Sequence, residues 1–237
     1  MAGPAQLRNI SQGRVTVPGS KEAVRWTFYD SILYPLLGTT RLDFFQLPQG
    51  QGITSSLGAV VGAPKTVHDT NMDLQGALPR FQDFQLESIE VDFFPGNSAA
   101  ANTFTANPLV AVHAAPLVIA DLDGANDEST FRQSGALILS ITSKDYLREA
   151  PLLRFPAKQH RNWDGAIGGP ADAAAVVGTA SQYDADGRPY FLDPFLMLLS
   201  NQNFMISLTW PGLVPTPSGF NARVMCIMEG ILYRNAQ

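Results

Sequence analysis

The sequence predicts an all-β protein built as an antiparallel sandwich, and three observations support this fold class. Short stretches rich in β-branched and aromatic residues recur along the chain. The 20 Gly and 17 Pro residues are spread between these stretches, which leaves little room for long helices. Phe is the most frequent aromatic residue, with 14 copies, as suits packed strands. With 237 residues, the chain can bury a substantial core.

The first third of the chain is predicted to hold an extended arm, two strands and a long loop. Residues 1–23 are polar and have no sustained period, so we expect an arm that becomes ordered when a neighbour holds it. Val24–Leu33 and Arg41–Leu47 are rich in strand-forming residues and end close to prolines. Residues 48–80 are expected to form a loop, and a loop of this length is more often an interaction element than idle.

Phe84–Phe94 carries the clearest strand pattern. Phe84 and Leu86 alternate with polar residues, and the alternation then continues in the other phase through Ile89, Val91 and Phe93. The change of phase at Ser88 predicts a β-bulge, because one extra residue reverses the side of the strand that faces inward.

The middle of the chain is predicted to contain further strands at Leu109–Ala120, Ala136–Ile141 and Leu152–Phe155. Ser143–Glu149 is expected to form one helical turn with Ser143 as its N-cap. Residues 157–189 are a glycine-rich insertion, in which the short run Asp172–Val177 has helical character.

The last third is again rich in strands. Phe191–Leu199 and Phe204–Trp210 are expected to form a hairpin around Ser200-Asn201-Gln202-Asn203. Ala222–Arg234 is apolar on both sides, which predicts a strand that is covered on both faces. For the strand count, this stretch is divided into two near Glu229-Gly230. About eight strands after residue 80, with two before it, favour a single jelly roll at 81–237 over a double one, preceded by an N-terminal segment at 1–80.

The charge composition argues against nucleic-acid binding as the main task. The net charge is −5, whereas neutralising phosphates requires a basic surface. Only 16% of residues are charged, against about 25% in typical soluble domains, which suits a surface that is buried against neighbouring subunits. There is no apolar signal core and no apolar run of about 18 residues, so we expect a soluble protein made in a reducing cytoplasm.

Two acidic stretches resemble parts of a calcium loop. Asp121-Leu122-Asp123-Gly124 is followed by Asp127, and the second stretch is Asp184-Ala185-Asp186-Gly187. Carboxylates at alternate positions can surround a hard cation, but both stretches lack the third ligand and the final Glu of the complete loop. A polar turn is therefore the favoured interpretation. The candidate metal ligands are Asp121, Asp123, Asp127, Asp184 and Asp186.

No catalytic constellation is evident, so we expect neither enzymatic activity nor a cofactor. His68, His113 and His160 are far apart and have no metal-ligand spacing. The chain has no GxSxG elbow and no phosphate-binding loop. The single cysteine, Cys226, lies in the middle of a predicted strand and is expected to be an inert core thiol.

The run DTNMDLQGALPRFQDFQLESIEVDFF (Asp69–Phe94) resembles segments of capsid proteins of tailless icosahedral bacteriophages of the jelly-roll lineage. FLMLLSNQNFMISLTWPG and VMCIMEGILYR are similar to the closing strands of such a barrel, and TFYDSILYPLLGTTRLDFFQLPQGQG is similar to an N-terminal extension of these proteins. The resemblance implies a jelly roll that self-assembles into a shell and has no enzymatic site.

The expected function is therefore that of a structural virion protein, present in many copies in the capsid and made in the host cytoplasm. Expected partners are further copies, other virion proteins and, in membrane-containing phages, an internal membrane. The alternative is a carbohydrate- or receptor-binding β-sandwich such as a lectin or viral spike. Its site would contain Trp163, Asp164, Tyr183 and Asp184. A cupin-type enzyme would need a His-rich metal motif that this chain lacks.

Overall fold

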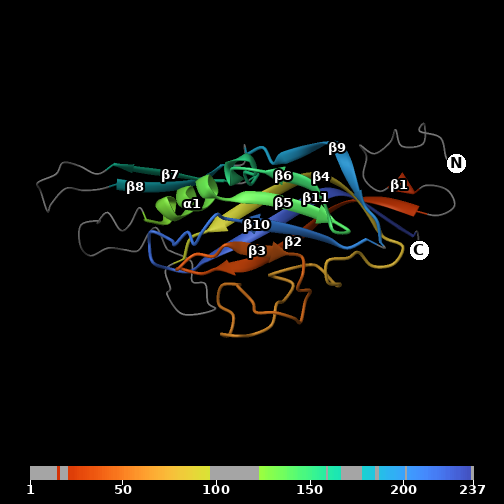
Figure 1. The fold of residues 1–237 in the computed structure, drawn as a ribbon, viewed down its shortest axis with the longest axis horizontal. Coiled ribbons are helices and arrows are strands. Elements are labelled where there is room, and N and C mark those ends of the chain that lie inside the picture. Colours follow the sequence, from red (N-terminus) through yellow and green to blue (C-terminus); the bar gives the residue numbers. More distant parts are fainter. Residues whose placement is uncertain are drawn as a thin grey trace, which may run out of the picture.

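In the computed structural model, two antiparallel sheets pack face to face, as the all-β prediction requires (Figure 1). The structure describes residues 15–16, 21–96, 123–158, 160–166, 178–184, 187–200 and 202–235. Within these ranges, only the backbone is described for residues 15–16, 123–125, 160–166 and 178–184.

The first sheet has the strand order β1-β2-β11-β4-β9, and the second has the order β3-β10-β5-β6. Neighbouring strands run antiparallel throughout both sheets. The strands of the first sheet are β1 (Val15–Thr16), β2 (Lys21–Tyr34), β4 (Asp83–Phe94), β9 (Tyr190–Leu198) and β11 (Ala222–Asn235). The strands of the second are β3 (Arg41–Phe44), β5 (Ala136–Ile141), β6 (Lys144–Glu149) and β10 (Phe204–Thr209).

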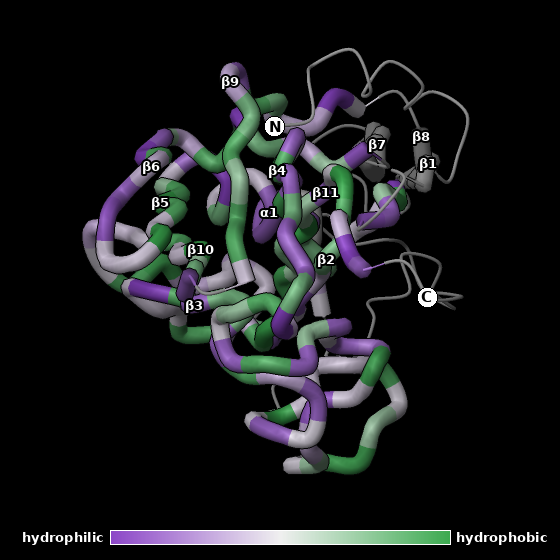
Figure 2. The backbone as a smooth tube through the Cα atoms, turned by 90° about the vertical axis from the view of Figure 1, so that its right-hand side faces the viewer, coloured by the Kyte–Doolittle hydropathy of each residue, from purple (hydrophilic) through white to green (hydrophobic). Residues whose placement is uncertain are grey.

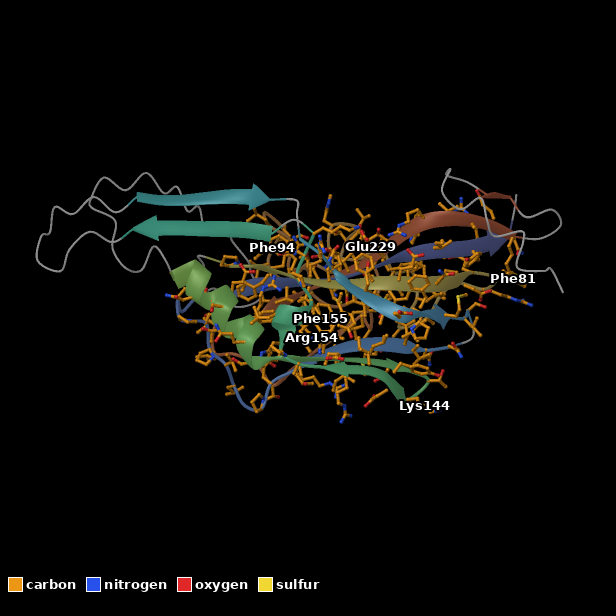
Figure 3. All side chains as sticks on the ribbon, turned by 90° about the horizontal axis from the view of Figure 1, so that it is seen from above. Phe81, Phe94, Lys144, Arg154, Phe155 and Glu229 are labelled. Carbon is orange, nitrogen blue, oxygen red and sulfur yellow. The ribbon has the colours of Figure 1, made fainter. Side chains whose placement is uncertain are left out.

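The core lies between the two sheets, where side chains fill the space (Figure 3). Alternation along each strand directs one set of residues inward, for example Leu137, Leu139 and Ile141 of β5. The predicted inward face of β5 is therefore confirmed. Strands β2 and β3 belong to these same sheets, so the strands expected in segment 1–80 share sheets with those expected in segment 81–237.

The predicted bulge in β4 is confirmed. The pairing of β4 with β11 shifts between Leu86 and Ser88, opposite Glu229 and Gly230. A side chain at Gly230 would place its Cβ atom 1.8 Å from the Gln85 carbonyl oxygen, so only glycine fits opposite the bulge. The predicted division of the last strand was wrong, because β11 continues unbroken past this point.

The face of β11 that turns inward is buried at Ala222, Val224, Cys226 and Met228, while the residues between them are half-buried. The strand lies centrally between β2 and β4, and its second face is thus only partly covered. The prediction of a strand covered on both faces holds for one of them.

Two predictions in the middle of the chain were wrong. Ser143–Glu149 is not a helical turn, because Lys144–Glu149 forms β6, which pairs with β5. Thr142 and Ser143 form the tight turn with φ values of 49° and 64°, as in a type I′ hairpin. Leu152–Arg154 forms a 3-10 helix, η4, instead of a strand, and it begins directly after Pro151.

Strands β9 and β10 do not form the predicted hairpin. Although the chain turns at residues 199–203, β9 pairs with β4 in the first sheet and β10 pairs with β3 and β5 in the second. Inward-facing side chains on both strands are buried, including Leu198 and Phe204. The two strands lie in opposite sheets and each buries side chains in the core between them, and this burial stabilises the fold more than hydrogen bonds between β9 and β10 would.

Helix α1 (Asp123–Ser134) was not predicted, and Asp123-Gly124 lies in its first turn and not in a polar loop. The helix covers one end of the sandwich because Phe131 inserts among Tyr34, Phe93 and Trp210. Ring centroids in this cluster lie 4.7 to 5.4 Å apart for the contacts of Phe131. Arg132 donates a hydrogen bond to the Val91 carbonyl oxygen at 2.9 Å.

The insertion at 157–189 contains a two-stranded ribbon, β7 (His160–Ala166) and β8 (Gly178–Asp184), which extends from the sandwich at the same end as α1 (Figure 1). The predicted strand at Leu109–Ala120 and the helical run at Asp172–Val177 lie outside the described residues, as does the arm apart from β1 and the start of β2.

Candidate functional site

The long loop between β3 and β4 is the most distinctive feature of the described chain. It runs from Phe45 to Gln82 and projects from the side of the sandwich where β2 and β3 lie (Figure 1). Its inner part is built into the fold, since Met72 and Leu78 are each 1% exposed and belong to the core. The loop is therefore a structured element and not a loose connection.

Part of this loop covers the free edge of β2. The Ser31 amide donates to the Asp69 carbonyl oxygen at 2.8 Å, and the Asn71 amide donates to the Tyr29 carbonyl oxygen at 3.3 Å. The Asn71 side chain also accepts from the Tyr29 amide at 3.0 Å and donates to the Thr27 carbonyl oxygen at 2.7 Å. These bonds satisfy backbone groups that an edge strand would otherwise leave unpaired.

A buried ion pair anchors the loop to the interior of the sandwich. The Lys65 ammonium nitrogen donates to Asp30 Oδ1 at 2.6 Å, and the two side chains are 2% and 0% exposed. Asp30 Oδ2 accepts from the Phe45 amide at 2.7 Å. Burial raises the pKa of Asp30 above its usual value, against the attraction of Lys65 and the hydrogen bonds to Phe45 and Thr70. Asp30 thus ties two parts of the loop to β2: Phe45 at its start and Lys65 in its middle.

Asp69 organises the base of the projecting segment. Its Oδ2 atom accepts from Thr54 Oγ1 at 2.6 Å and from the Thr66 amide at 3.0 Å. Its Oδ1 atom accepts from the Ser55 amide at 2.9 Å and from Ser56 Oγ at 2.8 Å. Burial opposes ionisation of Asp69, but these hydrogen bonds together hold its pKa below the usual value. The carboxylate therefore links residues 54–56 to Thr66 across the loop.

The end of the loop, residues 53–64, has a defined shape, and we call it the tip. The Thr54 amide donates to the Ala63 carbonyl oxygen at 2.8 Å, which closes the segment across its base. Within it, Ala59 bonds back to Ser56 and Ala63 to Val60, each forming a turn. Gly58 and Gly62 have φ values of 77° and 76° with open space around them, so glycine is needed there for the backbone turn and not for packing.

The tip presents apolar side chains to solvent. Val60 is 78% exposed, Val61 65%, Leu57 56% and Ile53 45%. Residues 53–64 contain no Asp, Glu, Lys or Arg. Figure 2 shows the loop at the lower side of the molecule, with apolar segments in green. A pre-formed apolar projection of this kind can bind another apolar surface with little loss of conformational entropy.

The ion pair could have been suspected from the sequence, although it was not predicted. Lys65 is the only Asp, Glu, Lys or Arg between Asp43 and Asp69. Asp30 interrupts an inward-facing series of Phe28, Ile32 and Tyr34 in β2. A charge among inward-facing apolar residues requires a partner, and Lys65 is an isolated candidate for it.

The candidate metal ligands are not brought together in the described part of the chain. Asp127 is 1% exposed, and its carboxylate accepts from the Ser218 amide at 2.8 Å and from Ser218 Oγ at 2.6 Å. Asp123 and Asp184 lie at the start of α1 and the end of β8, where only the backbone is described. Asp121 and Asp186 lie outside the described residues. Among described residues, no group of three or more His, Cys, Asp or Glu is arranged to hold a metal ion.

The residues of the alternative binding site lie on one ribbon. Trp163 and Asp164 are in β7, opposite Ser181 and Ala180, and Tyr183 and Asp184 are in β8, opposite Arg161 and His160. All four therefore lie on paired strands, but the register places Trp163 and Tyr183 on one face of the ribbon and Asp164 and Asp184 on the other, so the four are not brought together into one site.

Cys226 is fully buried in β11, and burial raises its pKa well above the usual value. The prediction of a core thiol is therefore confirmed. Trp210, which is 5% exposed, packs against Phe131 and Tyr34. His68 is exposed on the loop, His113 lies outside the described residues, and His160 is described by its backbone alone.

Comparisons with family models, curated proteins and solved structures found no match to this chain. Among the described residues, no helix is long and apolar enough to cross a membrane.

Proposed function

We propose that this chain is a structural virion protein that self-assembles, through many copies, into an icosahedral capsid. The observation that carries the proposal is the loop of residues 45–82, whose exposed apolar tip is held by the buried pair of Lys65 and Asp30. Such a rigid apolar projection suits contact with another protein surface. Shell assembly in the host cytoplasm, association with other virion proteins and the absence of an enzymatic site belong to the same proposal.

The strand order supports a jelly roll as the finer description of the sandwich. Without β1 and the β7–β8 ribbon, the strands in chain order are β2, β3, β4, β5, β6, β9, β10 and β11. The first pairs with the last, the second with the second to last, and so on inward: β2 with β11, β3 with β10, β4 with β9, and β5 with β6. This is the pairing that one long antiparallel ribbon adopts when it is rolled into a barrel, and jelly rolls occur in viral capsids and lectins.

The physical basis of assembly would be many modest apolar contacts between rigid bodies. Fully burying a Val or Leu side chain contributes about 1.5 to 3 kcal/mol, so one tip supplies a contact of intermediate strength. Each such contact is reversible alone, while many copies hold a closed shell together. With a charged fraction of 16%, copies approach one another with little repulsion.

Assembly can be tested with the purified full chain by light scattering on a sizing column and by negative-stain imaging. The proposal expects closed particles or rings that grow with protein concentration. Val60→Asp should prevent their formation, because it would bury a charge without a partner. Leu213→Asp is the matched control: Leu213 is 66% exposed, but it lies in the connection between β10 and β11. A chain that remains monomeric at high concentration would count against the proposal.

The second candidate is a carbohydrate- or receptor-binding module, favoured by Trp163 and Tyr183, which the register of the β7–β8 ribbon places on one face, with Asp164 and Asp184 on the other. Two aromatic residues on one face of a ribbon suit the apolar face of a sugar ring. Binding to a glycan array that is lost in Trp163→Ala, from a chain that does not assemble, would favour this function over a capsid.

A further inference from the structure

We infer that the apolar tip of one copy binds the exposed edge of β9 on a second copy, in a head-to-tail contact. This inference rests on the proposed function and assigns the surfaces through which copies meet. The occupant of the β9 edge is thus residues 53–64 of another copy of this chain.

Strand β9 has the features of a binding surface. It is an edge strand of the first sheet, with β4 on one side and no strand on the other among the described residues. Phe191 is 61% exposed, Phe195 53%, Met197 44% and the adjoining Leu199 39%. Large apolar side chains of this size are costly to leave in water along an edge, so the surface is expected to be covered.

The two edges of the second sheet are protected in the usual way. Along β6, Arg148 pairs with Asp145 at 2.6 Å, and along β3, Arg41 pairs with Asp43 at 2.6 Å. Charged side chains on an edge prevent association with another chain. The contrast singles out β9, where Asp193 is the only charged residue; because Pro194 opposes backbone pairing at this edge, the contact is made by the exposed side chains.

The positions of the two surfaces determine the kind of contact. Figures 1 and 2 share a vertical axis, and in both views β9 lies at the upper side while the loop projects at the lower side. One copy therefore cannot cover its own β9 with its own tip, whereas two copies stacked in the same orientation can. A contact between different patches on identical chains leaves one free patch at each end, so it continues from copy to copy and closes into a ring only when successive copies are rotated; otherwise it gives an open filament.

The choice of a second copy as occupant follows from the complementary character of the two patches. The tip is apolar and has no charged residue, so it brings no charge of its own against Phe191, Phe195 and Met197. The ion pair and Asp69 fix its shape before contact. Each copy carries one tip and one β9 edge, so every apolar patch of this pair is matched in an assembly of identical chains.

Disulfide trapping tests this contact directly in the full-length chain. Val60→Cys and Phe195→Cys each add one exposed thiol, and the native Cys226 is buried. Under mild oxidation, an equimolar mixture of the two variants, one carrying a mass tag, should give mainly the mixed dimer. Each variant alone should give several-fold less dimer. The double variant V60C/F195C should form a ladder of covalent oligomers, because each copy makes two links.

The outcomes separate this inference from the proposed function. The control is a mixture of V60C and L213C. If particles form but the mixture of V60C and F195C cross-links no more than this control, the inference is overturned and the capsid proposal stands. Predominant dimers of F195C alone, with no ladder from the double variant, would also overturn it in favour of a two-fold contact. If the unmodified chain forms no assemblies and no cross-links appear, both fail.

Complementation provides an independent test. Val60→Asp and Phe195→Asp should each remain monomeric. Mixed together, they should form a one-to-one dimer and nothing larger, because one intact tip meets one intact β9 edge. Assembly of either variant alone to the size of the unmodified particles would contradict the head-to-tail contact.

Discussion

The ammonium group of Lys65 lies 2.6 Å from the carboxylate of Asp30, and neither side chain is more than 2% exposed. Lys65 belongs to the projecting loop and Asp30 to the inner face of β2, so this single contact joins the candidate binding element to the core. Since a buried pair offsets its desolvation only with good geometry, its main effect is to fix the position of the loop.

Removing one partner of this pair should destabilise the protein strongly. Lys65→Met leaves the Asp30 carboxylate buried without a cation, so we expect the free energy of unfolding to fall by about 3 to 5 kcal/mol. The double variant D30N/K65M should recover most of this loss, since the neutral side-chain amide that replaces the carboxylate can still accept the Phe45 hydrogen bond. Urea denaturation of the three proteins measures both effects. A loss below about 1 kcal/mol in K65M would show that the pair does not anchor the loop.

Loss of Asp69 should loosen the loop more than the sandwich. Asp69→Ala leaves Thr54, Ser55, Ser56 and Thr66 without their shared acceptor. Hydrogen exchange should accelerate in residues 53–66 by at least about tenfold, with little change in β5 and β10. Asp73→Ala, an exposed site in the same loop, is the control. Equal acceleration throughout the molecule would mean that Asp69 supports the whole fold.

Asp92 should make the stability depend on pH. Burial raises its pKa from 3.8 to about 7, while Arg132 opposes the shift and Glu128 adds to it. Between these pH values the native state retains a proton that the unfolded state has lost. The stability is therefore greatest below about pH 4 for this group and declines as the pH rises toward 7. Asp92→Asn should flatten this part of the profile, measured by thermal unfolding. An unchanged slope in D92N would contradict the assignment.

Gly230 should not tolerate a side chain. A Cβ atom there would lie 1.8 Å from the Gln85 carbonyl oxygen, so Gly230→Ala forces β11 and β4 apart at the bulge. We expect a loss on the order of 3 kcal/mol in stability or failure to fold. Gly212→Ala is the matched control, since nothing lies within 4 Å of its added Cβ atom. Equal stability of the two variants, measured by thermal unfolding, would contradict the close approach.

The strands could be predicted where burial on one face produces a clear alternation, as in Phe84–Phe94 with its bulge and in Ala136–Ile141. The errors arose where tertiary contacts decide the structure. Lys144–Glu149 is polar and has a local helical preference, but β5 provides a strand to pair with. Asp123–Ser134 has the composition of a turn, and it becomes a helix because Phe131 closes the end of the core. The assignment of β9 to the first sheet and β10 to the second likewise depends on which face each strand buries.

The candidate site was only half predictable. The length and composition of residues 48–80 indicated an interaction element, which stays a prediction, and the structure shows that the tip of this loop is apolar and exposed. The anchor depends on Lys65 meeting Asp30, which lies 35 residues away in the sequence, and no local pattern specifies that contact. The exposed edge of β9 was hidden for the same reason, because strand order determines which apolar strand lies at an edge.

The most direct test of the central claim, that this chain is a self-assembling shell subunit, is the mass of the purified full-length protein as a function of concentration. Light scattering on a sizing column should show large particles, or rings that grow with concentration, for the unmodified chain and for Leu213→Asp. Val60→Asp should elute as a monomer of 25.6 kDa. A folded, unmodified chain that stays at this monomer mass at every concentration would contradict the claim.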